Sequence, residues 1–294
     1  MKRRAVRRDL SLSARMLIVL VMLIAVAVGG IVGAVGLLML VSGIWVVYGL
    51  LVAYAVLFLA VVQYRSAATT MLRAVRAREL LEHEEPELQA SISRLAALAD
   101  ALPPRIAVAR LDRPNSFTVG VRSRKTTIVV SRGLLELLSP AELDAVLAHE
   151  LAHVLNRDAA VMSAASLPRT IGLTIMAPAS EVGVLWTFIW FLGIPLWMVG
   201  SLLTLALSRY REFVADRGSA LLTGAPEQLM SALQKLASPG GEIPHEDLRR
   251  LGAVEALCIV PNRRVIVAAL ADHPPLEKRL AALAEIAREM GRPV

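Results

Sequence analysis

The chain has 294 residues, of which 56% are hydrophobic, and its formal net charge is +7. This apolar share is too high for a soluble enzyme and indicates membrane-spanning segments. The positive charge does not indicate a nucleic-acid partner, because Lys and Arg cluster beside apolar runs and not in a patch interleaved with aromatic residues. The single cysteine excludes an intrachain disulfide and gives no sign of an oxidising compartment.

The N-terminal region combines a basic segment with a long apolar run. Residues 16–62 contain no charged residue, and this run of about 47 residues is long enough for two transmembrane helices of about 20 residues each. A signal peptide is the alternative, but a second span follows at once and no clear cleavage site is present. Basic residues flank the predicted hairpin on both sides, which places the N-terminus and the chain from residue 65 onward in the cytosol.

The sequence of the region that follows indicates a helix and then a small sheet. Residues 66–102 mix Glu with Leu and Ala and predict solvated helix, which ends at Pro103 and Pro104. Three short β-branched or alternating runs then predict strands, and a short helix comes after them. The predicted strands are 105–109, 116–121 and 126–130, and the short helix is 133–138.

Residues 149–153 read H-E-x-x-H on a further predicted helix. Ser139, Pro140 and Glu142 form a capping-box pattern that begins this helix, and apolar residues then recur with a helical period. Two histidines four residues apart lie on one face of a helix and can reach a single metal ion. Glu150 is placed to accept a proton from a water that the metal activates. A pair of surface histidines on a polar face is the alternative.

Residues 159–207 predict a second apolar hairpin. Its first half, 159–180, is interrupted by Pro168 and Arg169, whereas 182–207 is uncharged and carries three tryptophans. Two buried or interfacial helices that cover the site are the alternative to a membrane hairpin.

Two acidic residues follow this segment with helical spacing. Glu212 and Asp216 are four residues apart, so both carboxylates share one helix face. A catalytic zinc needs a third protein ligand, which one of them can supply, while the other accepts the ring N–H of a ligand histidine. A solvated face with acidic groups among arginines is the alternative.

Five pieces of the sequence resemble the HtpX-type membrane zinc metalloproteases, which are relatives of the CAAX prenyl proteases in the gluzincin group. The order and spacing of the pieces match this family over nearly the whole chain. They are N-S-F-T-V-G at 115–120, S-P-x-E at 139–142, H-E-x-x-H with N-x-D at 149–158, S-R-x-R-E-F-x-A-D at 208–216, and H-P-P-L-x-K-R at 273–279.

The resemblance implies the composition of the metal site. It assigns His149, His153 and Glu212 as the ligands of one Zn²⁺ per chain and Glu150 as the general base. It assigns Asp216 as an outer partner that orients a ligand.

The resemblance also implies an edge strand beside the zinc that includes Asn115, Ser116 and Phe117. This strand would hold an extended substrate by main-chain hydrogen bonds. The usual family pattern has Ala at the positions of Ser116 and Thr118, a departure that can alter side-chain preference. His273 has two interpretations: a donor to the oxyanion of the tetrahedral intermediate, or a residue that precedes the final helix.

Together, the residues and the resemblance predict an α+β, mostly helical membrane protein. It would have about four transmembrane helices and a cytosolic zincin-like metalloprotease domain with a small β-sheet. The expected parts are 1–65, the basic segment and first hairpin; 66–158, the first part of the protease domain; 159–207, the second hairpin; and 208–294, the rest of the protease domain.

The expected protein is a multi-pass zinc endopeptidase of the cell (inner) membrane with both termini in the cytosol. Its substrates would be unfolded, misfolded or damaged proteins, including membrane proteins, and its role would be quality control. Besides these substrates, its expected partner is the lipid bilayer, with no nucleic acid. A non-catalytic membrane scaffold or chaperone with a retained zinc site and a CAAX-type processing protease are the alternatives.

Overall fold

The computed structural model divides into two compact units. The first contains the described residues of 68–160 and 208–294, and the second contains those of 9–67 and 161–207. Helix α8 (Val184–Thr223) contributes residues to both units. The described residues are 72–73, 75–81, 83–120, 126–176, 184–237 and 274–292, with single positions between 22 and 61.

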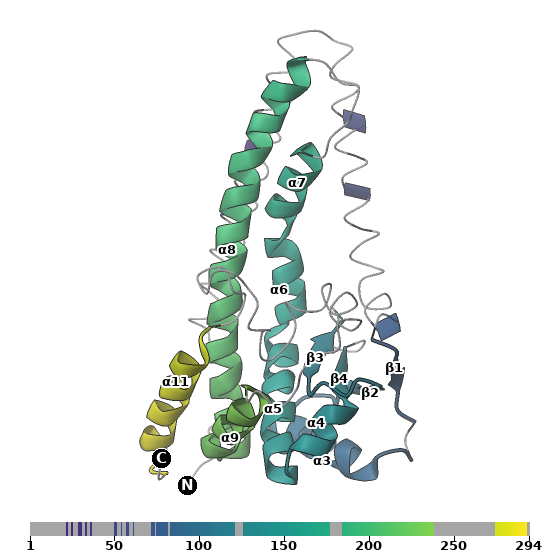
Figure 1. Ribbon diagram of the computed structural model, residues 1–294, viewed down its shortest axis with the longest axis vertical. Coiled ribbons are helices and arrows are strands. Elements are labelled where there is room, and N and C mark those ends of the chain that lie inside the picture. The colour runs from purple at the N-terminus through teal and green to yellow at the C-terminus, as the bar shows by residue number, and fades with distance from the viewer. Residues whose placement is uncertain are drawn as a thin grey trace. The chain divides into compact units, whose positions relative to one another are not determined.

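A four-stranded mixed sheet belongs to the first unit (Figure 1). Its strand order is β1-β2-β4-β3, in which β2 and β4 are parallel and the two outer pairs are antiparallel. In the described part of the chain, β3 is therefore an edge strand. The strands are β1 (Ala77–Glu79), β2 (Arg105–Ala109), β3 (Ser116–Val119) and β4 (Thr127–Ser131).

The sheet has an apolar cluster on each of its faces. Ile128 and Val130 of β4 belong to the main core, whereas Val129 between them belongs to a second cluster. Phe117 and Val119 of β3 also belong to the second cluster. The residues that alternate with them on β3 therefore face the main core.

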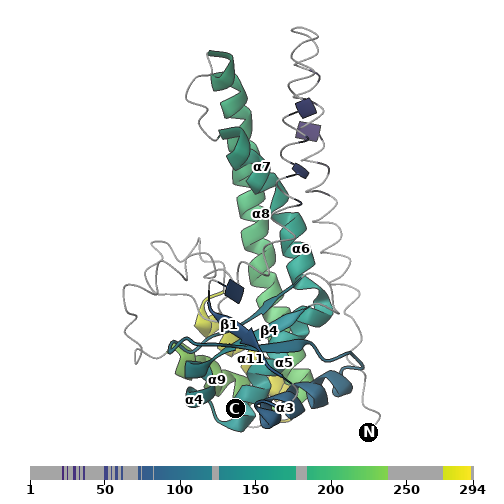
Figure 2. The same ribbon diagram turned by 90° about the vertical axis from the view of Figure 1, so that its right-hand side faces the viewer.

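Helix α5 (Pro140–Asn156) lies in the main core, beside the strands in both views (Figures 1 and 2). It contacts β3, α3 and α9, and α9 in turn contacts α11. Leu147 and Leu151 of α5 are fully buried, and burying a leucine side chain stabilises a fold by about 1.5–3 kcal/mol. The other helices of this unit are α3 (Pro86–Leu98), α4 (Arg132–Leu137), α9 (Pro226–Ala237) and α11 (Leu276–Glu289).

The predicted capping box at the start of α5 is confirmed. Glu142 Oε2 accepts a hydrogen bond from the Ser139 main-chain N at 2.8 Å, and Ser139 Oγ accepts one from the Glu142 main-chain N at 3.4 Å. The helix ends at Asn156, because Arg157 adopts the left-handed conformation with φ of 57°. The segment that carries H-E-x-x-H is thus a helix with defined ends.

In the second unit, α7 (Leu167–Met176) packs closely against the first part of α8. A Cβ atom on Gly172 would lie 2.7 Å from the main-chain O of Gly193, and one on Gly200 would lie 2.6 Å from the main-chain N of Arg169. Ascending positions on α7 thus meet descending positions on α8, so the two helices are antiparallel. Small residues let their backbones approach each other. Helix α6 (Asp158–Ala165) precedes them.

Within the described part of the chain, no helix is both long and apolar enough to cross a membrane. The first predicted hairpin, in 1–65, lies almost entirely outside the described residues.

The prediction for residues 66–102 was wrong in part, because the described residues of this region contain β1 as well as α3. Strand β1 forms by pairing with β2. Its sequence, Ala-Arg-Glu, has low strand propensity, so the local sequence does not predict a strand there. Helix α3 is not solvated all round, since Leu88, Ile92 and Leu95 are buried. The prediction of a mostly helical protein with a small sheet is confirmed.

Candidate active site

Helix α5 presents His149, Glu150 and His153 to the protein interior. Their exposed fractions are 1%, 2% and 8%. Buried polar groups require partners, and buried charges require pairing, so these side chains are not an ordinary solvated face. The alternative of two surface histidines is therefore excluded.

Helix α8 lies directly against α5. A Cβ atom on Gly218 would lie 2.7 Å from the Cβ atom of Ala152, so a larger residue at 218 would force a shift. Ser219 Oγ donates a hydrogen bond to the main-chain O of Ala145 at 2.6 Å. This close approach brings Glu212, earlier on the same helix, beside the two histidines.

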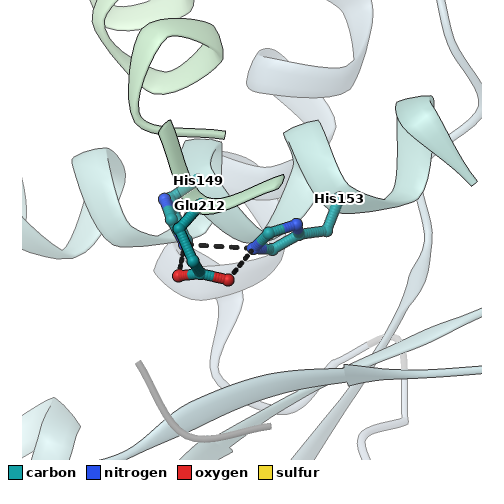
Figure 3. Close-up of side chains that lie close together, drawn as sticks. All are labelled: His149, His153 and Glu212. Carbon is teal, nitrogen blue, oxygen red and sulfur yellow. Dashed lines mark hydrogen bonds and ion pairs between the residues drawn. The ribbon is translucent and has the colours of Figure 1, made fainter. Parts of the chain in front are cut away.

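His149, His153 and Glu212 converge on one point (Figure 3). The two Nε2 atoms are 3.1 Å apart. Glu212 places Oε2 3.7 Å from Nε2 of His149 and Oε1 3.6 Å from Nε2 of His153. One ligand atom from each residue lies within 4.8 Å of the others, so the three side chains can hold a metal ion.

The donor set and the charge of the site fit a divalent zinc ion. Ligand atoms about 2.0–2.1 Å from a tetrahedral zinc lie about 3.3 Å apart, close to the separations found here. Among the described residues, the buried site contains four carboxylates and two guanidinium groups, so its charge with neutral histidines is 2 − 4 = −2. A dication would balance this charge. The groups are Glu150, Asp158, Glu212 and Asp216 with Arg211 and Arg279.

The outer nitrogen of His149 faces a buried aspartate that is paired with an arginine. Nδ1 of His149 lies 3.0 Å from Oδ1 of Asp216. Arg279, on α11, donates to both oxygens of Asp216, from Nη2 at 2.6 Å and from Nε at 2.8 Å. Burial alone raises the pKa of Asp216, but Arg279 and His149 hold it below its usual value. Asp216 is therefore ionised and can only accept, which directs the ring hydrogen to Nδ1 and leaves Nε2 for a metal.

The outer nitrogen of His153 faces a different aspartate. Nδ1 of His153 lies 2.5 Å from Oδ2 of Asp158, the first residue of α6. Arg211 places Nε 3.4 Å from the same oxygen and donates from Nη2 to Glu212 Oε1 at 3.3 Å. In both histidines, Nδ1 thus faces an aspartate that is itself in contact with an arginine. This arrangement directs the Nε2 atom of each ring toward the other and toward Glu212.

Glu150 is hydrogen-bonded to the edge strand. Ser116 Oγ donates to Oε1 of Glu150 at 2.9 Å, and Thr118 Oγ1 donates to Oε2 at 2.7 Å. The carboxylate of Glu150, the residue after His149, therefore lies between α5 and β3.

The other residues predicted to bind substrate take different places. Asn115 precedes β3 and is buried, and its main chain bonds to Ser131. Phe117 is 2% exposed and belongs to the second apolar cluster, on the sheet face away from α5. Ser116 is the predicted residue whose side chain points at Glu150. Substrate binding by this strand stays a prediction, and His273 lies outside the described residues.

Three residues were given no role in the metal site by the sequence interpretation: Arg279, Asp158 and Thr118. Arg211 had two interpretations, a residue that steadies the carboxylates of the site or a mark of the cytosolic membrane edge, and it contacts Asp158 and Glu212. Arg279 and Asp158 lie inside the motif pieces at 273–279 and 149–158, so the signal was the position within a matching motif. Thr118 carried a different signal, because it is two residues from Ser116 and shares its strand face.

The comparisons with known proteins agree with this geometry. The sequence matches the model of peptidase family M48 over residues 82–287, a range that includes every residue of the site described above. The chain belongs to peptidase family M48. The Protease HtpX homolog 2 of Methanosarcina mazei is 38% identical over 83% of this chain and 88% of its own. The Protease HtpX homolog of Moorella thermoacetica is 37% identical, and the match covers 98% of each chain. The chain is therefore a metalloprotease of the HtpX type.

A solved structure shares the fold. The crystal structure of S. mikatae Ste24p superimposes with a TM-score of 0.54 at 20% sequence identity. The match covers 93% of this chain and 66% of the Ste24p chain, so this chain spans slightly less than two thirds of that protein. At this identity the likeness concerns the fold alone.

Proposed function

We propose that this HtpX-type metalloprotease is a zinc-dependent endopeptidase in which His149, His153 and Glu212 bind the metal and Glu150 is the general base. The observation that supports the proposal most directly is the buried convergence of His149, His153 and Glu212. Glu150, a further buried carboxylate, lies on the same helix as the two histidines. Three protein ligands leave one position for water and substrate, as a catalytic zinc site requires.

The residues of the chain divide the work of hydrolysis among them. The chemistry that Zn²⁺ supplies when bound is polarisation of the scissile carbonyl and a lower pKa for the attacking water. Glu150 accepts the proton of this water and later delivers it to the leaving amide nitrogen. Asp216 and Asp158 keep the histidine rings in the orientation that presents Nε2. The reaction needs no nucleophilic side chain.

Strand β3 would dock an extended substrate. The main-chain O of Asn115 accepts from the main-chain N of Ser131 at 2.9 Å, so this pair is hydrogen-bonded across the ladder. In an antiparallel pair the hydrogen-bonded residues alternate, so the main-chain groups of Ser116 and Thr118 point away from β4. A substrate strand that pairs with these groups would run beside Glu150.

A membrane location is the second part of the proposal, with 1–65 and 159–207 as two hairpins and the protease domain in the cytosol. The uncharged runs and the basic flanks support it. So does the second unit, where α7 and α8 meet at glycines while large apolar side chains face outward. In α8 these side chains are Phe191, Met198 and Leu202, which are 59%, 49% and 56% exposed.

The substrate class follows from this location and from the resemblance to HtpX-type proteases. A cytosolic catalytic domain next to the bilayer would meet the exposed, extended segments of misfolded or damaged membrane proteins. Because an edge strand recognises the main chain, it tolerates many side chains and suits a quality-control protease.

The catalytic part of the proposal is tested with detergent-purified wild type and Glu150→Gln. We expect both to bind about one zinc per chain by mass spectrometry, and only the wild type to cleave casein. A matched control is Glu136→Gln, at an exposed glutamate of α4, which should cleave casein like the wild type. Equal cleavage by Glu150→Gln would refute the assigned base. Absence of zinc from the wild type after metal is resupplied would refute the metal site.

The membrane part is tested by fusing green fluorescent protein or periplasmic alkaline phosphatase to the C-terminus in a bacterial host. A cytosolic C-terminus predicts a fluorescent fusion in the membrane fraction and an inactive phosphatase fusion. An active phosphatase fusion would contradict the orientation, and a fluorescent fusion in the soluble fraction would contradict membrane anchoring.

A further inference from the structure

Two hydroxyl groups hold the two oxygens of Glu150 separately. Ser116 binds Oε1 and Thr118 binds Oε2, at 2.9 Å and 2.7 Å. Ser116 is fully buried and Glu150 is 2% exposed. Hydrogen bonds to an ionised acceptor in such surroundings are stronger than bonds between neutral groups in water. Because one bond ends on each oxygen, rotation of the carboxylate plane would lengthen at least one of them.

The register of β3 decides which side chains reach Glu150. Two hydrogen bonds anchor the main chain of Asn115 to Ser131: Asn115 N donates to Ser131 Oγ at 2.8 Å, and Asn115 O accepts from Ser131 N at 2.9 Å. Phe117 fills the second apolar cluster on the opposite sheet face. A slip by one residue would turn Phe117 toward Glu150 and both hydroxyl groups away from it. The anchored start and the buried phenylalanine therefore fix the hydroxyl pair in place.

We propose that Ser116 and Thr118 are positioning residues that aim the carboxylate of the general base. The inference rests on the proposed role of Glu150. A carboxylate offers about four lone-pair sites, so each oxygen that accepts one hydroxyl can still accept a proton from water. The usual pattern of HtpX-type proteases has Ala at both positions, so these two hydroxyl groups distinguish this chain from that pattern. The side chains of Ser116 and Thr118 therefore position Glu150, and they do not select the side chains of the substrate.

The same two residues connect the base to the substrate. Their main-chain groups point to the edge of β3 that pairs with no other described strand, where a substrate strand would pair, and their side chains bond to Glu150. A substrate strand that pairs in register therefore places its scissile bond relative to a base held by the same segment. The distance between the scissile bond and Glu150 is therefore set by β3 alone, since this strand both docks the substrate and holds the carboxylate.

The test compares shape-matched and hydroxyl-retaining variants of the full chain in detergent. Thr118→Val removes the hydroxyl and keeps the branched shape, Thr118→Ser keeps the hydroxyl, and Ser116→Ala removes only the oxygen. We expect Thr118→Val and Ser116→Ala each to lower kcat on a fluorogenic casein peptide about 10-fold, and the double variant about 100-fold, at unchanged KM. Zinc content should equal that of the wild type, and each single variant should stay folded with Tm lowered by no more than about 10 °C, because one hydrogen bond to a buried carboxylate is lost. Thr118→Ser should retain nearly the wild-type kcat.

A binding measurement separates positioning of the base from docking of the substrate. In the Glu150→Gln background, Ser116→Ala and Thr118→Val should leave the Kd for fluorescein-labelled casein unchanged. A Kd that rises by the factor lost in kcat/KM would assign both residues to substrate binding and overturn the inference.

Two further results would overturn it: a wild-type kcat in the double variant, or equal losses in Thr118→Ser and Thr118→Val. Failure of the proposed function looks different, because Glu150→Gln would then cleave casein like the wild type. If Ser116→Ala does not fold, the two variants of the half-buried Thr118 decide the matter.

Discussion

The two histidines of the cluster are supported by the same kinds of groups, drawn from different parts of the chain. In what we call the His149 arm, His149 faces Asp216 of α8, which Arg279 of α11 binds through both oxygens. In the His153 arm, His153 faces Asp158, five residues later, and Arg211 approaches this aspartate to 3.4 Å. Oδ1 of Asp158 accepts no hydrogen bond from the described residues.

This difference suggests different roles for the outer groups on the two sides of the proposed metal site. The His149 arm joins three helices that are far apart in the sequence, so it couples the metal site to the packing of the C-terminal helix. The His153 arm joins the end of α5 to the start of α6 through residues close in sequence, and its arginine, Arg211 of α8, contacts the aspartate at 3.4 Å, a longer distance than the two hydrogen bonds from Arg279 to Asp216. We therefore expect the His149 arm to matter for both stability and metal affinity, and the His153 arm mainly for metal affinity.

The largest effect should come from Glu212, which the arginines of both arms approach, Arg211 to 3.3 Å and Arg279 to 3.5 Å. Glu212→Gln keeps the size of the side chain but replaces the anionic ligand, so we expect the zinc bound per chain to fall to near zero. Casein cleavage should fall by at least about 100-fold, since the activated water is lost with the metal. Mass spectrometry of purified protein and a cleavage assay check this, with Glu289→Gln, an exposed position of α11, as the control. Full zinc content in Glu212→Gln would remove Glu212 from the ligand set.

The second effect compares the two arginines. Arg279→Met leaves the buried charge of Asp216 without its bidentate partner, which should lower the free energy of unfolding by about 3–5 kcal/mol. Arg211→Met removes longer contacts and should cost about 1–3 kcal/mol. Denaturant unfolding of metal-free protein measures both, because bound zinc would itself stabilise the fold. Equal losses of unfolding free energy in the two variants would contradict the larger contribution to stability that we assign to the His149 arm.

The third effect compares the two aspartates. Asp158→Asn and Asp216→Asn should each lower zinc affinity by about 10–100-fold, because the partner that orients a ligand histidine is weakened. Competition with a chromogenic chelator measures this affinity. Only Asp216→Asn should also lower the unfolding free energy strongly, since it removes the charge of the carboxylate that accepts two short hydrogen bonds from Arg279 and leaves Glu212, at 3.5 Å, as a longer contact. A large loss of stability in Asp158→Asn alone would reverse our assignment of the two roles.

The smallest effect concerns an ion pair outside the candidate metal site, between Glu142 of α5 and Lys235 of α9. Burial raises the pKa of Glu142, but hydrogen bonds from Lys235, Ser231 and Ser139 lower it to about 2, below the 4.5 of a free glutamate. A lowered folded-state pKa stabilises the fold above about pH 4.5, and this contribution is lost as the pH falls from there toward about 2. Glu142→Gln should therefore make Tm fall less steeply between about pH 5 and about pH 3.

The control for this pair is Glu136→Gln, which should keep the wild-type slope. Lys235 is 42% exposed, so solvent screens the pair and the effect at neutral pH should stay below about 1 kcal/mol. An identical slope in Glu142→Gln and the wild type would contradict the lowered pKa.

Much of the fold was predictable because its signals are local. The capping box at Ser139 fixed the start of α5, three alternating runs gave β2, β3 and β4, and the Pro pair at 274–275 marked the start of α11. Strand β1 was missed because its three residues form a strand only by pairing with β2, a contact that depends on the tertiary structure.

The candidate site was predictable where spacing on one helix carries the chemistry, as for His149 and His153. The outer groups were harder, because Arg279 meets Asp216 across 63 positions of sequence, and no periodicity reports such a contact. Ser116 was predicted as a substrate residue, but its side chain bonds to Glu150, which follows from strand register and not from the motif. Sequence patterns thus pointed to the groups that converge in the candidate site, and the structure was needed to find what holds them.

The most direct test of the account is an anomalous difference map at the zinc absorption edge from crystals of the zinc-loaded full-length protein. The account predicts one peak per chain, about 2.0–2.2 Å from Nε2 of His149, Nε2 of His153 and a carboxylate oxygen of Glu212, with Glu150 not coordinated. A peak at another place, or a ligand set that lacks Glu212 or includes Glu150, would contradict it.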